Sequence, residues 1–384
     1  MRNTKTYEEV IAFVRDLYGQ PDAFLPLHEP RFRGNEKKLV SDCIESTFVS
    51  SVGRYVDQFE EEVAKYVGSR YAVAMVNGTS ALQLALKEAK AVQGDLVITQ
   101  SATFVATVNA IVYNGAEPCF VDIEEETLGM SPDALTRFLD ERTILDDGVC
   151  KEKESGKRVA ACVPMHTFGY PCRIEEIADV CEQYGITLIE DSAESLGSWV
   201  GKTHTGRFGE MGVFSFNGNK ILTTGGGGLV VTDNEAVAKH LKHLSTTAKT
   251  PHPYEFVHDE IGYNFRMPNL NAALGCAQLE SLPEYLEKKR EIHSAYSQFF
   301  ESGSWRLVGE REGTRANHWL NAIVLESRDE RDAFLEETNG KGVMTRPLWT
   351  PMHRLEMFSS APKGDLSVTE DMANRVVNLT SSVP

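Results

Sequence analysis

The sequence has little of what marks membrane, secreted or nucleic-acid-binding proteins. No stretch approaches the roughly 18 consecutive apolar residues that a membrane helix requires. The polar segment Met1–Val10 lacks the apolar core of a signal peptide. Positive charge is scarce, since 39 Lys and Arg face 56 Asp and Glu, for a formal net charge of -17. Nucleic acids and anionic membranes select for basic faces, so we expect a cytoplasmic protein that binds neither.

Cysteine is present, but not in the arrangement of a disulfide framework or a zinc site. The seven cysteines are scattered along the chain, and none forms a C-x-x-C pair. We therefore predict no disulfide framework and no metal site. We expect the cysteines to be small buried apolar residues.

The chain does have the composition and length of a folded globular protein with one large and one smaller domain. Of its 384 residues, 41% are apolar and 25% are charged, which are ordinary values for such a protein. From residue 71 onward, short apolar runs alternate with segments of helical period, the pattern of an α/β fold around a mainly parallel sheet. Seven strands are predicted, at residues 71–76, 96–99, 118–122, 159–164, 187–190, 212–216 and 228–232.

The chain is predicted to divide into three segments. Residues 1–30 carry a short amphipathic pattern, which indicates a helix appended outside the core. Residues 31–248 form the large domain. Residues 249–384, with a Pro-broken connector, a long helix and then short strands and helices, form the smaller one. Within the large domain, the charged and aperiodic stretch 146–158 is predicted to be an exposed loop that is dispensable for chemistry.

The first candidate for a functional site is the segment 77–82 (NGTSAL), between a predicted strand and an amphipathic helix. Free N–H groups at a helix start, together with the hydroxyls of Thr79 and Ser80, make a natural cradle for a phosphate. The same residue types are preferred helix caps, so a purely structural role is equally open.

The second candidate is Asp191, which ends the apolar strand in LIEDSAE. Ligands of α/β sheets bind at the carboxyl ends of the strands. An aspartate at such an end can hold a metal or cap a helix. An organic cation is an equally reasonable partner.

The third candidate is Lys220, which follows a strand in VFSFNGNK and precedes the glycine run 225–228. Glycines there let the backbone approach a bound ring closely. Taken singly, Lys220 is more often expected to be a solvated surface lysine.

Together the three candidates indicate a pyridoxal-phosphate site. Such a site needs a lysine for the Schiff base, an acid for the pyridine nitrogen and a phosphate pocket, all at one sheet edge. Asp191 and Lys220 are 29 residues apart, about one further β unit, so both can lie at that edge.

Several longer segments carry a family resemblance that covers the chain from about residue 30 to its end. They are NGTSALQLAL, TFVATVNAI, MHTFGYPCRIEEI, LIEDSAESLGS, GRFGEMGVFSFNGNKILTTGGGG, GYNFRMPNLNAALGCAQLE and RPLWTPMH. In these segments the chain resembles the DegT/StrS-type (DegT/DnrJ/EryC/StrS) sugar aminotransferases. The resemblance implies the fold of aspartate aminotransferase, which is fold type I. It has a large domain with a mainly parallel seven-stranded sheet and a smaller C-terminal α+β domain.

The resemblance also implies the catalytic residues and the cofactor, pyridoxal 5'-phosphate. Lys220 would form the Schiff base and then act as general base and general acid. Asp191 would pair with the pyridine nitrogen. Glu194 stands where many members have glutamine. The resemblance therefore does not determine which contact this residue makes near the phenolic oxygen of the cofactor. The run of four glycines replaces the more usual G-E-G-G.

Further cofactor contacts follow from the same resemblance. Phe104 would stack on the face of the cofactor ring. Asn264 would reach the phosphate from the neighbouring subunit, which implies a homodimer with shared active sites. The residues that would hold the phosphate within one chain are Gly78, Thr79, Ser80 and Ser215.

The phrases EPRFRGNE and YNFRMPNLNAALG, the N-terminal extension and the loop near residue 150 are similar to one subgroup of this family. That subgroup aminates the 4-keto group of a UDP-linked 6-deoxy-N-acetylhexosamine in bacillosamine or legionaminic-acid pathways for bacterial surface glycans. The resemblance implies a nucleotide-diphosphate keto-sugar as substrate and an amino acid, L-glutamate by analogy, as amine donor. Candidate contacts to the sugar or diphosphate are Arg346, Trp349 and His353, although Trp349 could equally have a packing role.

Two alternative functions stay open. Some relatives of this group are sugar dehydratases, which are expected to lack the lysine. A non-catalytic regulator could keep the same fold, because fold alone does not determine function.

Overall fold

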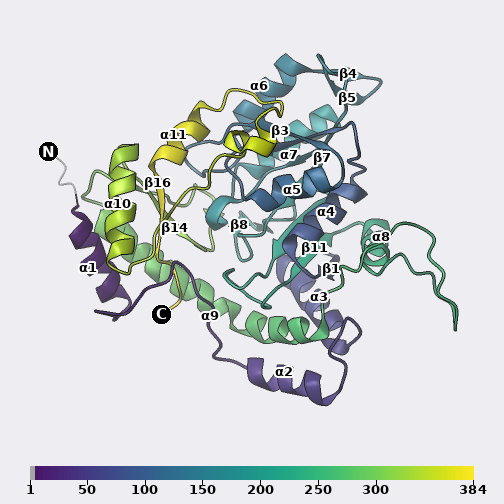
Figure 1. Ribbon diagram of the computed structural model, residues 1–384, viewed down its shortest axis with the longest axis horizontal. Coiled ribbons are helices and arrows are strands. Elements are labelled where there is room, and N and C mark those ends of the chain that lie inside the picture. The colour runs from purple at the N-terminus through teal and green to yellow at the C-terminus, as the bar shows by residue number, and fades with distance from the viewer. Residues whose placement is uncertain (1–4) are drawn as a thin grey trace.

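The computed structural model describes residues 5–384 and has a seven-stranded sheet at its centre (Figure 1). The strand order is β1-β11-β10-β7-β6-β2-β3. β11 is antiparallel to both of its neighbours, and the other pairs are parallel. The predicted α/β fold is confirmed. All seven predicted strands are present: β1 (Tyr71–Met75), β2 (Leu96–Gln100), β3 (Glu117–Val121), β6 (Val159–Val163), β7 (Thr187–Asp191), β10 (Met211–Ser215) and β11 (Gly228–Thr232).

Helices cover both faces of this sheet, because successive side chains of a strand point to opposite faces. In β10, Val213 packs in the cluster that contains α4, α5 and α8, while its neighbour Phe214 packs with α3 on the other face. In β6, Cys162 packs with α6 and α7. These six helices are α3 (Arg54–Val67), α4 (Gly78–Glu88), α5 (Val105–Tyr113), α6 (Pro132–Arg142), α7 (Ile174–Tyr184) and α8 (Glu235–Ser245).

The carboxyl ends of β1, β7 and β10 meet at one edge of the sheet, because these three strands are parallel. Asp191, the last residue of β7, is in register with Val213 of β10. Ser215, the last residue of β10, is in register with Gly228, the first residue of β11. Gly228 has to be a glycine, since a Cβ there would lie 2.3 Å from the carbonyl oxygen of Asn77. The sheet therefore brings the three candidate segments together.

The C-terminal part of the chain forms a smaller α+β unit beside the main sheet (Figure 1). Its four-stranded antiparallel sheet has the order β12-β14-β16-β15. Its elements are α9 (Asn269–Phe300), β12 (Arg306–Leu307), β14 (Asn321–Val324), α10 (Arg328–Gly340), β15 (Arg346–Pro347), α11 (Ser367–Arg375) and β16 (Val376–Leu379). This agrees with the fold that the resemblance implies.

The N-terminal helix α1 (Tyr7–Leu17) packs into the core of this C-terminal unit. Val10 and Val14 are buried in one cluster with Tyr296 of α9 and Phe334 of α10. The prediction of a helix was right, but its placement outside the core was wrong. An amphipathic pattern shows that one face is buried and does not say against what. The division near residues 30 and 248 stays a prediction.

The charged stretch 146–158 is not the plain exposed loop that the sequence suggested. β4 (Thr143–Asp146) and β5 (Val149–Glu152) pair as an antiparallel hairpin, in which Cys150 and Glu152 are buried. The turn is Asp147-Gly148, and both residues have positive φ, 49° and 78°. Asp-Gly is a preferred pair for two-residue hairpin turns, so this signal was present in the sequence and overlooked.

Short elements complete the fold. All seven cysteines are free and buried, which confirms their expected role as core residues. Among residues 5–384, none of the helices combines the length and apolar character needed to cross a membrane. The remaining elements are α2 (Glu36–Glu45), β8 (Trp199–Val200), β9 (Thr203–His204), β13 (Thr314–Arg315) and three short 3-10 helices, η1 (Thr167–Gly169), η2 (Met352–Arg354) and η3 (Glu356–Phe358).

Candidate active site

A cavity of about 350 Å³ lies at the carboxyl edge of the main sheet, where the three candidate segments meet. Segments far apart in the sequence line it, because the topology gathers the strand ends there. Eight of the residues named from the sequence border this cavity: Gly78, Thr79, Phe104, Asp191, Glu194, Ser215, Lys220 and Trp349.

The start of α4 offers a site for an anion in this cavity. Asn77 caps the helix, and its Oδ1 accepts a hydrogen bond from the N–H of Ser80 at 2.8 Å. The N–H groups of Gly78 and Thr79 belong to the first turn, where a helix provides no backbone partner. Both residues line the cavity. The helix dipole adds a partial positive charge at the same place, so the geometry suits a phosphate.

Gly78 brings Ser215 next to this helix start. A Cβ at Gly78 would lie 2.9 Å from the Cβ of Ser215, closer than real side chains approach. The glycine therefore allows α4 to pack against the end of β10. As a result the hydroxyl-bearing Ser215 borders the same space as Thr79.

Asp191 lies on the cavity wall and is almost completely buried, at 2% exposure of the residue. Thr107 Oγ1 donates a hydrogen bond to Oδ2 at 2.6 Å, and the N–H of Ala193 donates to Oδ1 at 3.2 Å. Burial raises the pKa of Asp191, while the bonds from Thr107 and Ala193 and the charge of Lys220 oppose that rise. A buried carboxylate prepared in this way can pair with a cationic ring nitrogen.

Lys220 points its amine into the cavity between a carboxylate and an aromatic ring. Its Nζ lies 3.1 Å from Glu194 Oε1 and 4.0 Å from the centroid of the Trp319 ring. The other oxygen of Glu194 accepts a hydrogen bond from the N–H of Phe168 at 2.8 Å. Burial raises the pKa of Glu194 to about 7, although the charge of Lys220 opposes it.

An aromatic wall borders the cavity on the side of the C-terminal unit. Trp349 packs against Phe168 with ring centroids 5.0 Å apart, and against Phe104 at 6.3 Å. Phe104 is 48% exposed, so much of its ring is free to contact a ligand. Trp349 therefore packs against Phe168 and Phe104 and also lines the cavity.

The residues of this cavity fit pyridoxal phosphate. A primary amine, a buried carboxylate and a helix start with two free N–H groups border one space. These are the three groups that the cofactor requires.

Two predicted residues near the site do not line this cavity. Ser80 is buried, and its N–H is taken by Asn77. Asn264 is exposed on a segment that is bridged to Thr246 at the end of α8. Its predicted contact is with a neighbouring subunit, so this geometry does not test it.

The two predicted substrate contacts other than Trp349 also lie away from the cavity. Arg346 is exposed in β15, and its guanidinium donates to Asn339 Oδ1 at 2.8 Å. His353 is bound through its two ring nitrogens to Ser101 and Glu370, each at 2.7 Å. Their roles as sugar or diphosphate contacts stay predictions.

The structure adds residues that sequence reasoning missed. Thr107 reaches Asp191 from 84 positions away. Trp319 reaches Lys220 from the C-terminal unit. Neither belongs to a recognisable local motif around its partner, although Thr107 lies within the TFVATVNAI segment. The cavity is also lined by residues that lie within the segments quoted from the sequence but were given no role of their own: Asn77, Leu82, Ala106, Met165, Ala193, Asn217 and Asn219.

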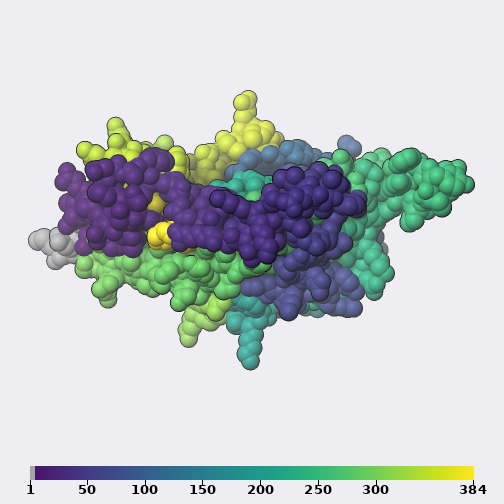
Figure 2. All heavy atoms as spheres, turned by 90° about the horizontal axis from the view of Figure 1, so that it is seen from below, coloured from purple at the N-terminus to yellow at the C-terminus, as the bar shows by residue number. Residues whose placement is uncertain are grey.

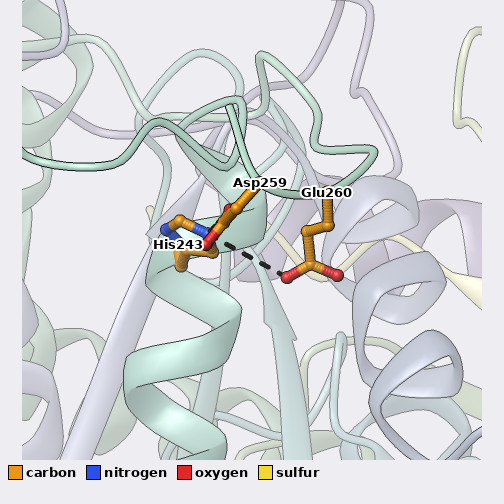
Figure 3. Close-up of side chains that lie close together, drawn as sticks. All are labelled: His243, Asp259 and Glu260. Carbon is orange, nitrogen blue, oxygen red and sulfur yellow. Dashed lines mark hydrogen bonds and ion pairs between the residues drawn. The ribbon is translucent and has the colours of Figure 1, made fainter. Parts of the chain in front are cut away.

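A second polar cluster lies outside this cavity, at the base of an arm formed by residues 249–262. Figure 3 shows His243 of α8 beside Asp259 and Glu260 of the arm. His243 Nε2 lies 2.7 Å from Asp259 Oδ1 and 4.0 Å from Glu260 Oε1. One atom from each of these three residues lies within 4.8 Å of the others, so the group has the chemistry to hold a metal ion. Ion pairs between His243 and the carboxylates of Asp259 and Glu260 explain the same contacts without a metal ion.

His240, one turn earlier on α8, extends this cluster. Its ring nitrogens lie 2.5 Å from Glu88 and 2.7 Å from Glu260. The two histidines therefore tie the arm to the body of the protein. The arm projects well beyond that body (Figures 1 and 2).

Comparison with known proteins gives a consistent result over almost the whole chain. Residues 30–383 match the model of the DegT/DnrJ/EryC1/StrS aminotransferase family. EpsN of Bacillus subtilis (strain 168), provisionally named a pyridoxal phosphate-dependent aminotransferase, is 36% identical over 360 residues, which cover 92% of this chain and 90% of EpsN. GDP-perosamine synthase of Vibrio cholerae is 35% identical over 360 residues, which cover 93% of this chain and 94% of that protein.

Solved structures show the same fold. The crystal structure of the aminotransferase TlmJ from Streptoalloteichus hindustanus superposes with a TM-score of 0.85 at 26% identity. The superposition covers 94% of each chain. The likeness therefore includes both the main sheet and the C-terminal unit.

Proposed function

The chain belongs to the DegT/DnrJ/EryC1/StrS aminotransferase family, and from this premise we propose that it transfers an amino group from an amino acid to the keto group of a nucleotide-linked sugar. The enzyme depends on pyridoxal phosphate, as its family does. One observation carries the proposal: Lys220, Asp191 and the start of α4 border a single cavity.

Each of these groups has a task in such a reaction. When bound, pyridoxal phosphate supplies the electron sink that makes the α-proton of the donor acidic. Nζ of Lys220 accepts that proton as general base and later delivers a proton to the sugar carbon as general acid. Asp191 holds its negative charge against the ring nitrogen, and the N–H groups of Gly78 and Thr79 bind the phosphate.

We propose a 4-keto-6-deoxy-N-acetylhexosamine linked to UDP as the sugar substrate and L-glutamate as the donor. The resemblance of EPRFRGNE and YNFRMPNLNAALG to that subgroup supports the sugar. A second candidate is the GDP-linked 4-keto sugar, because two of the most similar relatives are named GDP-perosamine synthase. Phe104 would stack on the cofactor, and Trp349, which also lines the cavity, would contact the sugar in either case.

The alternatives are disfavoured by the residues present. A sugar dehydratase of this group is expected to lack the lysine, whereas Lys220 is present with its amine in the cavity. A non-catalytic regulator would be expected to have lost a catalytic group. Asp191, Lys220 and the helix start are all intact.

We further propose a homodimer in which Asn264 of one chain completes the phosphate site of the other. Asn264 is exposed and lies away from the cavity of its own chain. The adjoining arm carries large apolar side chains that are exposed, as expected of a surface covered by a partner. These are Tyr254 (81%), Phe256 (80%) and Ile261 (80%).

The test is a screen of UDP-, GDP- and dTDP-linked 4-keto sugars with 15N-labelled L-glutamate. Mass spectrometry would score 15N in the amino-sugar product, together with release of 2-oxoglutarate. We expect transfer to a UDP-linked sugar that is absent from Lys220→Ala. Transfer only to a GDP-linked sugar would select the second candidate. Loss of a sugar hydroxyl without transfer of nitrogen would instead establish a dehydratase.

A further inference from the structure

We propose that Trp319 is a positioning residue that holds the free amine of Lys220 in the active cavity. The inference rests on the proposed role of Lys220 as the catalytic base. A lysine that alternates between a covalent bond and a free state needs something to keep its flexible side chain in place in the free state. Lysine has four rotatable bonds, and its amine otherwise samples many positions.

The geometry places the amine between two partners. Lys220 Nζ lies 4.0 Å from the centroid of the Trp319 ring, within the range of a cation–π contact. On the other side, Glu194 Oε1 lies 3.1 Å away. The side chains of Lys220 and Glu194 are only 12% and 1% exposed, and Trp319 is 4% exposed, so little water competes for the amine.

Trp319 is itself held at several points. Its indole N–H donates a hydrogen bond to the carbonyl oxygen of Asn219 at 2.7 Å, immediately before Lys220 in the chain. Its carbonyl oxygen accepts a hydrogen bond at 2.8 Å from Lys289, whose side chain is fully buried. The ring therefore cannot turn away from the lysine without breaking its hydrogen bond to Asn219, and the bond from Lys289 holds the backbone of Trp319 in place.

Asn317 links Trp319 to Glu194, the two partners of the Lys220 amine. Its Oδ1 accepts a hydrogen bond from the N–H of Trp319 at 2.8 Å. Its Nδ2 donates to the carbonyl oxygen of Glu194 at 2.7 Å. Gly169 leaves the space that this requires, since a Cβ there would lie 1.8 Å from Asn317 Oδ1. One side chain thus sets the distance between the aromatic and the acidic partner of Lys220.

Both partners can contact the ammonium group that Lys220 carries once it has accepted a proton. The face of an indole ring attracts an ammonium group and has much less attraction for a neutral amine. When Nζ takes the α-proton of the donor, the C–H bond breaks, an N–H bond forms and the amine becomes positively charged. Trp319 and Glu194 then keep this ammonium close to the atoms to which it must return a proton.

The test is nuclear magnetic resonance of the cofactor-free full-length protein, with lysine labelled with 13C at Cε. A ring face beside Nζ shifts the neighbouring Cε protons of Lys220 upfield, and this resonance is assigned by its loss in Lys220→Arg. We expect Trp319→Leu to return the resonance to the ordinary lysine position. Trp319→Phe, which keeps a ring face, should retain part of the shift. Trp349→Leu is the matched control, because Trp349 lines the same cavity and no contact joins it to the lysine amine.

Kinetics provide the second readout. Trp319→Leu should lower kcat about tenfold, which corresponds to about 1.4 kcal/mol, and leave the KM for the amino donor within about twofold. A merely structural role would lower thermal stability without moving the Lys220 resonance. If Trp319→Leu does not fold, Trp319→Met can replace it, because it keeps more of the buried volume. It should likewise return the Lys220 resonance to its ordinary position and lower kcat.

Two results would overturn the proposal: a Lys220 resonance at the ordinary position in the unmodified protein, or an upfield resonance that Trp319→Leu or Trp319→Met leaves in place. Because the resonance is measured without cofactor or substrate, it also separates this proposal from the proposed function. An upfield resonance in a protein that transfers no amine would contradict only the function.

Discussion

Thr107 and Asp191 are joined by a buried hydrogen bond of 2.6 Å, between a hydroxyl on α5 and a carboxylate at the end of β7. Burial alone raises the pKa of Asp191, and the donated bond from Thr107 is the largest influence that opposes this rise. The bond therefore favours the ionised carboxylate that a cationic ring nitrogen needs.

Thr107→Val should weaken amine transfer at low pH. The substitution keeps the shape and removes a hydrogen bond to a charged group, worth about 1.5–3 kcal/mol. The pKa of Asp191 should rise further, because the bond from Thr107 is the main influence that lowers it. The measurement is kcat against pH, in which the acidic limb should move to higher pH. Thr99→Val is the control, because Thr99 is also buried but bonds the carbonyl oxygen of Val163. An unmoved acidic limb would contradict the role of Thr107.

Glu194→Gln should change how stability depends on pH in the cofactor-free protein. Burial raises the pKa of Glu194 to about 7, above the ordinary value of 4.5. Between these values the folded chain binds more protons than the unfolded chain, so stability falls as pH rises through this window. We expect a loss on the order of 1–3 kcal/mol between pH 5 and pH 8, which urea unfolding measures. The loss should be much smaller in Glu194→Gln, and an equal loss in both proteins would refute the assignment.

The arm formed by residues 249–262 should loosen as the pH rises. Burial lowers the pKa of His240, but hydrogen bonds to Glu88 and Glu260 outweigh that effect and the pKa is raised. Attachment of the arm through His240 is therefore fully present below about pH 6.5 and is lost as the pH rises through the higher folded pKa.

Limited proteolysis or hydrogen exchange of the arm measures this change. Opening should be faster at pH 9 than at pH 6, and His240→Asn should remove most of the difference. His252→Asn, which lies in the arm but outside the cluster of Figure 3, is the control. Opening that is independent of pH in the unmodified protein would exclude the proposed attachment.

Two inactive variants should complement each other if active sites are shared. A mixed dimer of Lys220→Ala and Asn264→Asp would contain one site with both defects and one site with neither. After reversible dissociation and mixing, we expect recovery toward a quarter of normal activity, since about half of the dimers are mixed and each has one intact site of two. Asn264→Asp must first be shown to be inactive alone. If unmodified chains recover after the same treatment and the mixture does not, the shared site is ruled out.

Local patterns in the sequence were enough to predict the main sheet and the edge at which the candidate residues gather. Apolar runs marked the seven strands, and the residues that end or follow them, Asp191 and Lys220, lie together because parallel strands end at one edge. Trp319 could not be predicted in this way, because its bond to Asn219 spans 100 positions and two units of the fold. The partner of α1 was missed for the same reason, since amphipathicity does not identify what covers a helix.

Lys220 is proposed as the lysine that binds pyridoxal phosphate covalently. Borohydride reduction of the purified protein, followed by digestion and mass spectrometry of the peptides, tests it most directly. We expect a chromophore that absorbs well above the protein band, is bleached by the reductant, and leaves the added mass on the peptide that contains Lys220. An adduct on any other lysine, with Lys220 unmodified, would contradict it.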